Sequence, residues 1–141
     1  MLGERTAEEI KIGLGSAFPS PADSHAEIRG RDLVSGLPKT IVVSGDEIRK
    51  AMEEPVNAIV DAIQTTLDTC PPELAGDIMD RGVTITGCGA LLRGLDERLR
   101  HETGMPITLS EVALESVALG SGKCVEEFDA LQQVLTSEPR S

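Results

Sequence analysis

The amino-acid sequence predicts an α/β fold that carries a small subdomain made of one helix and a β-hairpin. Residues 83–86 are rich in β-branched side chains and lead through two glycines into a leucine-rich helical pattern, as in a strand–turn–helix unit. Apolar residues from Ile48 to Leu67 recur mostly at spacings of three and four, which is typical of an amphipathic helix. Residues 26–34 and 40–44 are β-prone and flank a Gly-Leu-Pro turn, which predicts a hairpin with one wet face.

Composition places the protein among acidic proteins with one core. The chain has 141 residues, 40% of them apolar, and a net charge of −11, which should repel nucleic acid and anionic membrane surfaces. No run approaches 18 apolar residues and the first 17 residues lack a signal-peptide pattern, so we expect a cytoplasmic location without direct membrane insertion. Cys70, Cys88 and Cys124 are widely spaced, which favours small core residues over disulfides or a zinc site.

The N-terminal third reads as a subdomain that needs support from a larger unit. Thr6 and Glu9 have the spacing of a capping box, which predicts a helix from about Ala7 to Gly13. On that helix Glu8 and Lys11 are neighbours three residues apart, and a solvated ion pair explains them without any function. With the hairpin, this third has too little apolar surface to fold alone.

The middle of the chain is predicted to be helical, with breaks set by proline. Ser44 and Glu47 form a second capping box at the start of the long helix, and Pro55 inside it should bend or split that helix. A short helix of residues 73–79 follows, ending at Gly82.

The last third is predicted to contain two more helices and a second strand. The helix after the glycine turn should start at about Ala90 and end near Gly104, and residues 106–109 should form a strand parallel to the first one. A final helical pattern runs from 114 to 135, followed by a polar tail at 136–141.

The glycine turn is the main candidate site that local chemistry offers. A strand, a tight turn and a helix N-terminus in succession point backbone N–H groups at a possible anion, and glycine allows close approach. A plain tight turn explains the same residues. The dinucleotide pattern would need glycine at Leu92, and the P-loop pattern would need lysine and a hydroxyl residue at Leu95 and Asp96. His25 and His101 lack partners at metal-ligand spacing, so neither a metal site nor a catalytic residue is predicted.

Four segments resemble one protein family in the same order: GERTAEEIKIGLGSAFP, EIRGRDLVSGLPKTI, PPELAGDIMDRGVTITGCGALLRGLDERL and VALGSG. They are similar to the C-terminal half of MreB and its Mbl relatives, the bacterial actin-like proteins that maintain cell shape. The resemblance implies an RNase H-like half of the actin, Hsp70 and sugar-kinase fold. Residues 1–44 would form an incomplete subdomain IIB, residues 45–135 an incomplete subdomain IIA, and residues 136–141 a flexible tail.

The resemblance also implies a nucleotide site and partners. Members bind ATP or ADP with Mg²⁺ between their two halves, form filaments of like subunits in the cytoplasm beneath the membrane, and organise cell-wall synthesis. A RodZ-like membrane protein is the implied partner of subdomain IIA. Glycine is usual in the family where this chain has Cys88. The positions that match the family's nucleotide-contacting residues are Glu8 and Lys11 on the nucleoside side, and Thr86, Gly87, Cys88, Gly89 and Ala90 at the phosphates and sugar.

Three readings of the function stay open at this point. The resemblance favours one wall of the nucleotide cleft of an MreB-like protein, with no ATP turnover by this chain alone because the metal-binding and hydrolytic residues belong to the other half. The chain would then be a fragment or truncated product of a longer protein. A second reading is a non-catalytic interaction module that kept the fold, for which Cys88 is the best support. A third is the C-terminal part of a sugar kinase of the same superfamily.

Overall fold

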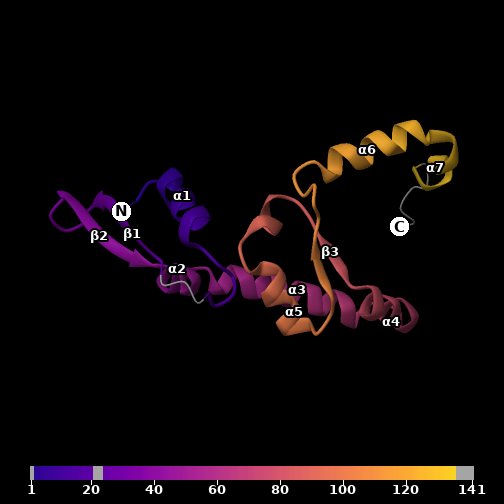
Figure 1. Cartoon of the computed structure of the whole chain (residues 1–141), viewed down its shortest axis with the longest axis horizontal. Coiled ribbons are helices and arrows are strands. Elements are labelled where there is room, and N and C mark those ends of the chain that lie inside the picture. The colour runs from indigo at the N-terminus through magenta and orange to yellow at the C-terminus, as the bar shows by residue number, and fades with distance from the viewer. Residues whose placement is uncertain (1, 21–23, 136–141) are drawn as a thin grey trace.

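The computed structural model describes residues 2–20 and 24–135, as a mixed α/β chain with two separate two-stranded sheets. Helix α1 and the β1–β2 hairpin lie at one end, α3 and α5 form the centre, and α6 and α7 extend away from them (Figure 1). In chain order the elements are α1 (Glu4–Leu14), β1 (His25–Arg31), β2 (Pro38–Ser44), α2 (Gly45–Ala51), α3 (Glu53–Asp68), α4 (Pro72–Arg81), β3 (Val83–Ile85), the 3₁₀ turn η1 (Cys88–Leu91), α5 (Leu95–Thr103), β4 (Ile107–Leu109), α6 (Ser116–Glu126) and α7 (Phe128–Leu135).

Helix α1 begins earlier than its sequence predicted. Its N-cap is Gly3, which makes no side-chain cap, and the amide of Ala7 donates to the Gly3 carbonyl over 3.0 Å. Thr6 therefore lies inside the first turn, so the predicted capping box of Thr6 and Glu9 is wrong. The C-terminal end is as predicted, because Gly15 caps the helix with its amide on the Lys11 carbonyl at 2.8 Å.

The predicted hairpin is present, with a shorter first strand and a longer second strand than predicted. β1 and β2 pair antiparallel from His25 opposite Ser44 to Arg31 opposite Pro38. The first strand was predicted to reach Val34, but it ends at Arg31 because the Asp32 carboxylate accepts the amides of residues 34 and 35 and so starts a turn. Alternate side chains of β1 are exposed, as expected for one wet face, whereas β2 is exposed along most of its length.

The second capping box and the proline break are both confirmed. Ser44 caps α2: its side chain accepts the Glu47 amide at 3.3 Å, and the Glu47 carboxylate accepts the Ser44 amide at 2.8 Å. The helix breaks at Met52, and Pro55 falls in the first turn of α3. That position suits proline because the first amides of a helix have no intrahelical carbonyl partner. Helix α4 follows with Pro72 as its first residue.

The core lies where α3, α5 and β4 meet. Strands β3 and β4 pair in parallel, as predicted, with Val83 opposite Ile107. Across the helix interface, Arg98 of α5 donates to Asn57 of α3 at 2.7 Å and to Glu53 at 3.1 Å, with only 14% of its side chain exposed. The buried residues of this cluster are Ala17, Val56, Val60, Leu95, Leu99, Met105 and Ile107.

Two helices of the last third differ from the prediction. Helix α5 starts at Leu95 and not at Ala90, because the chain first makes the 3₁₀ turn and then reverses at Gly94, whose φ is +70°. The final helix is divided into α6 and α7 at Glu127. The predicted tail at 136–141 lies outside the described residues. None of the described helices combines the length and the apolarity that a membrane crossing would need.

Candidate functional site

The turn after β3 presents two backbone amides that have no partner in the described part of the chain. Gly87 has a φ of +85°, and its amide donates to the Ala113 carbonyl at 2.9 Å. The 3₁₀ turn then closes with the Ala90 amide on the Gly87 carbonyl at 3.1 Å. The amides of Cys88 and Gly89, the first two of this turn, enter no such bond. Open space surrounds the Cβ positions of Gly87 and Gly89, so an anion could approach both amides.

Thr86 fixes the start of the turn, at the end of β3. Its hydroxyl oxygen lies 3.1 Å from the Ala113 carbonyl oxygen and 2.8 Å from the Ser116 hydroxyl. These contacts anchor the end of β3 to the loop before α6 and to the first residue of α6, so the Thr86 side chain is already engaged within the protein. Ala90 is buried, with 7% of its surface exposed, and fixes the opposite end of the turn.

Cys88 has ordinary backbone geometry. No residue other than glycine has a positive φ among the described residues, so the left-handed position of the turn belongs to Gly87 and a side chain at Cys88 causes no backbone strain. The Cys88 side chain is exposed, and Cys70 and Cys124 are only half-buried, which corrects the prediction that the cysteines fill the core.

The predicted nucleoside-side residues lie together on α1. Lys11 Nζ is 2.7 Å from the Glu8 carboxylate, and the two side chains are 44% and 55% exposed. They border a hollow of about 430 Å³ between α1, the hairpin and α2, which has Ile28, Ile48 and Met52 among its apolar walls. No hydrogen bond or ion pair connects this pair directly to the glycine turn within residues 2–20 and 24–135.

Arg93 connects the helix that carries Glu8 and Lys11 to the segment after the glycine turn, and sequence analysis missed it. Its guanidinium donates to the carbonyl of Ile12 at 3.0 Å and to that of Gly13, which are 81 and 80 residues away at the end of α1. Its own carbonyl accepts the Ala17 amide at 2.7 Å and the Ser16 hydroxyl at 3.2 Å. An arginine and a glycine inside an apparently helical pattern, at 93 and 94, were the available signal that the chain leaves the helix there.

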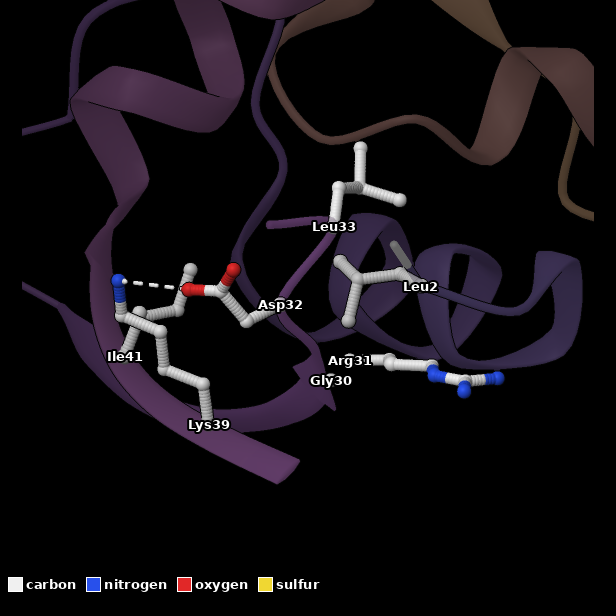
Figure 2. Close-up of a pocket in the computed structure, with 7 residues that line it drawn as sticks. All are labelled: Leu2, Gly30, Arg31, Asp32, Leu33, Lys39 and Ile41. Carbon is white, nitrogen blue, oxygen red and sulfur yellow. Dashed lines mark hydrogen bonds and ion pairs between the residues drawn. The ribbon is translucent and has the colours of Figure 1, made fainter. Parts of the chain in front are cut away.

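A second hollow of about 300 Å³ lies at the end of the hairpin and contains none of the predicted site residues. Figure 2 shows the Lys39–Asp32 ion pair on one side and the Arg31 guanidinium directed away from it. Lys39 Nζ is 3.4 Å from Asp32, while the amides of residues 35 and 34 lower the pKa of the Asp32 carboxyl further than this lysine does. The described residues contain no cluster of His, Cys, Asp and Glu that could hold a metal ion.

Comparison with known proteins identifies the family. The family model described as MreB/Mbl protein matches residues 1–133. The chain belongs to the MreB/Mbl family. It is 47% identical over 131 residues to the cell shape-determining protein Mbl of Bacillus subtilis, covering 93% of this chain and 39% of Mbl. It is 46% identical over 129 residues to the cell shape-determining protein MreB of Escherichia coli, covering 92% and 37%. The chain therefore spans about two fifths of the length of these relatives.

Solved structures of the MreB/Mbl family share this fold. MreB5 of Spiroplasma citri bound to ADP superposes with a TM-score of 0.85 at 34% identity, covering 96% of this chain and 41% of MreB5. The AMPPNP-bound form of MreB5 gives a TM-score of 0.86, covering 94% and 40%. The predicted family and the predicted actin-like fold are confirmed, and the sugar-kinase alternative is disfavoured.

Proposed function

We propose that this chain forms one wall of an ATP-binding cleft in an actin-like, filament-forming protein that maintains cell shape. The observation that carries the proposal is the pair of open amides at Cys88 and Gly89, within a fold shared with MreB5 structures that hold ADP and AMPPNP. Amides at the start of a helical turn carry partial positive charge, and phosphate oxygens are their natural acceptors.

The residues divide into a phosphate side and a nucleoside side. The amides of Cys88 and Gly89 would donate to phosphate oxygens, while Gly87 shapes the turn and Thr86 and Ala90 hold it in place. Glu8 and Lys11 would border the nucleoside, since about half of each side chain is exposed. Mg²⁺ accompanies ATP mainly through the phosphates, and its remaining ligands would come from residues across the cleft.

Hydrolysis would require the second wall. The turn contributes backbone donors and an exposed thiol, but attack on a phosphate also needs a positioned water in line with the leaving group. We therefore expect binding without turnover by this chain. Filament formation with like subunits, a cytoplasmic location beneath the membrane and a RodZ-like membrane partner are proposed from family membership.

Calorimetric titration of ATP with Mg²⁺ into the 141-residue chain tests the proposal, first alone and then mixed with the remaining N-terminal part of a relative such as Mbl. We expect weak binding alone and tighter binding in the mixture. A Gly89→Val variant should weaken binding about tenfold because its side chain would occupy the space beside the open amides. The control is Gly76→Ala. A Cβ at Gly76 also meets open space, but Gly76 belongs to α4 and not to the turn.

The outcomes separate the two remaining readings. Absence of binding heat in both settings would reject the nucleotide role and leave the interaction module. Equal affinity for ATP in the wild type and in a folded Gly89→Val variant would show that the nucleotide does not bind at the glycine turn.

A further inference from the structure

The end of α1 and the segment after the glycine turn are held together by one residue, Arg93. Its side chain reaches two carbonyls at the end of α1, while its main-chain carbonyl accepts the Ala17 amide and the Ser16 hydroxyl. Gly94 allows this approach, because a Cβ there would lie 2.9 Å from Ser16 Oγ and 3.0 Å from the Phe18 amide nitrogen. We call these contacts the Arg93 joint.

The chemistry of the joint suits a fixed connection. The last four carbonyls of a helix lack intrahelical partners and carry partial negative charge, so a guanidinium with several donors in one plane can satisfy two of them at once. Arg93 donates to the carbonyls of Ile12 and Gly13, and the Gly15 amide donates to the carbonyl of Lys11. The joint therefore fixes the end of the same helix that carries Glu8 and Lys11.

We propose that Arg93 is a positioning residue that holds α1 in register with the glycine turn, so that the nucleoside and phosphate ends of one nucleotide meet their partners together. This inference rests on the proposed nucleotide function. Arg93 itself contacts protein carbonyls, and its effect on the ligand passes through α1. The joint keeps the phosphate side and the nucleoside side at a fixed separation. Binding of one end of ADP then places the other end next to residues that are already positioned for it.

The proposal predicts a specific pattern across ligands. Pyrophosphate reports on the phosphate side alone, adenosine on the nucleoside side alone, and ADP on both. Loss of the joint should lower the affinity for ADP about tenfold while the affinity for pyrophosphate changes less than about twofold, because only the connection between the sides is lost. A general loss of structure would lower both affinities by the same factor.

The experiment compares the wild-type chain with Arg93→Ala, Arg93→Lys and the control Arg5→Ala. Arg5 lies on α1, the helix that Arg93 contacts, in an exposed ion pair with Glu9. The control therefore removes an arginine charge without touching the Arg93 joint. NMR titrations measure the affinities for ADP, pyrophosphate and adenosine, and amide hydrogen exchange of residues 10–17 measures the joint without any ligand. We expect faster exchange and selective loss of ADP binding in Arg93→Ala, partial rescue in Arg93→Lys, and wild-type behaviour in Arg5→Ala.

Two results would overturn the inference while the proposed function stands: ADP binding by Arg93→Ala as tight as by the wild type, or an equal loss for ADP and pyrophosphate. Unchanged hydrogen exchange in Arg93→Ala would also overturn it, whether or not nucleotide binds. If the wild-type chain binds neither ADP nor pyrophosphate, the proposed function fails, and the positioning role fails with it.

Discussion

Gly94 is a residue at which two segments far apart in the sequence come into contact. It adopts a φ of +70°, and its missing side chain leaves room for Ser16 and Phe18. Gly104 has nearly the same φ, +69°, but a Cβ there would meet open space. The two glycines thus share the conformational requirement, and only Gly94 adds a requirement for close approach.

This difference gives a prediction at the residue scale. Gly104→Ala should lower the free energy of unfolding by about 1 kcal/mol through backbone strain alone, and Gly94→Ala by about 2 kcal/mol or more, because neighbouring backbone must also move. Urea denaturation of both variants measures the two costs. Equal costs would show that the segment of residues 16–18 does not press on Gly94.

At the scale of single elements, the capping box of Ser44 decides where the hairpin ends and α2 begins. The Ser44 side chain and the Glu47 carboxylate satisfy one amide each, and both bonds lie at the junction of β2 and α2. The junction therefore sets the direction in which the hairpin leaves the rest of the molecule.

We expect Ser44→Ala to lower the free energy of unfolding by about 1 kcal/mol, which is typical for removal of an N-cap side chain. Thermal unfolding by circular dichroism measures the change. Thr6→Ala is the matched control: Thr6 lies inside the first turn of α1, so its loss should change stability by less than half as much. A larger effect at Thr6 than at Ser44 would contradict the assignment of caps.

The same capping box predicts a pH dependence. The Ser44 amide, followed by the Ser44 hydroxyl, lowers the pKa of Glu47 below its ordinary value of 4.5. A carboxyl whose folded pKa is lowered stabilises the folded state fully above its unfolded pKa, and loses that contribution as pH falls through the folded pKa. Stability measured between pH 6 and about pH 3 should therefore decrease less steeply in Glu47→Gln than in the wild type. Identical slopes would show that the carboxylate does not act as a cap in solution.

At the scale of the whole molecule, a small core supports a large surface. The chain exposes 10631 Å², whereas a compact protein of 14.9 kDa exposes about 7,000 Å². Large apolar side chains contribute to this surface on several elements, for example Val117 and Val125 of α6, which are 79% and 76% exposed. Few contacts beyond the core therefore hold the helices, and stability should depend strongly on the central cluster.

Leu99 is the residue at which this dependence is best measured. This residue of α5 is 1% exposed within the central cluster, so Leu99→Ala should lower the free energy of unfolding by about 3 kcal/mol through lost burial and a cavity. Leu119→Ala in α6 is the matched control: Leu119 is 51% exposed, and its truncation should cost far less. Comparable costs would show that α6 packs against a partner in solution. Chemical denaturation measures both variants.

Sequence alone determined the features that depend on neighbouring residues. The strand before Thr86, the Ser44 cap and the break before Pro55 follow from local chemistry, and the order of four segments was sufficient to identify the family. The strand–helix–strand order also gave the parallel partnership of β3 and β4. In the candidate site, the sequence predicted the position of the glycine turn and placed Glu8 next to Lys11, while the nucleotide role of these residues stays a prediction.

Only the tertiary structure decided how these parts are connected. Leu91 and Leu92 fit a helical pattern, yet the chain makes a 3₁₀ turn up to Leu91 and is extended at Leu92. Arg93 then binds carbonyls at the end of α1, and Gly94 lies close to the segment that follows α1. A contact distant in sequence also decided which amides of the turn lack a partner, since the Gly87 amide donates to the Ala113 carbonyl. These contacts join residues 26 to 81 positions apart, and no local pattern encodes them because they form only when the packed core brings those segments together.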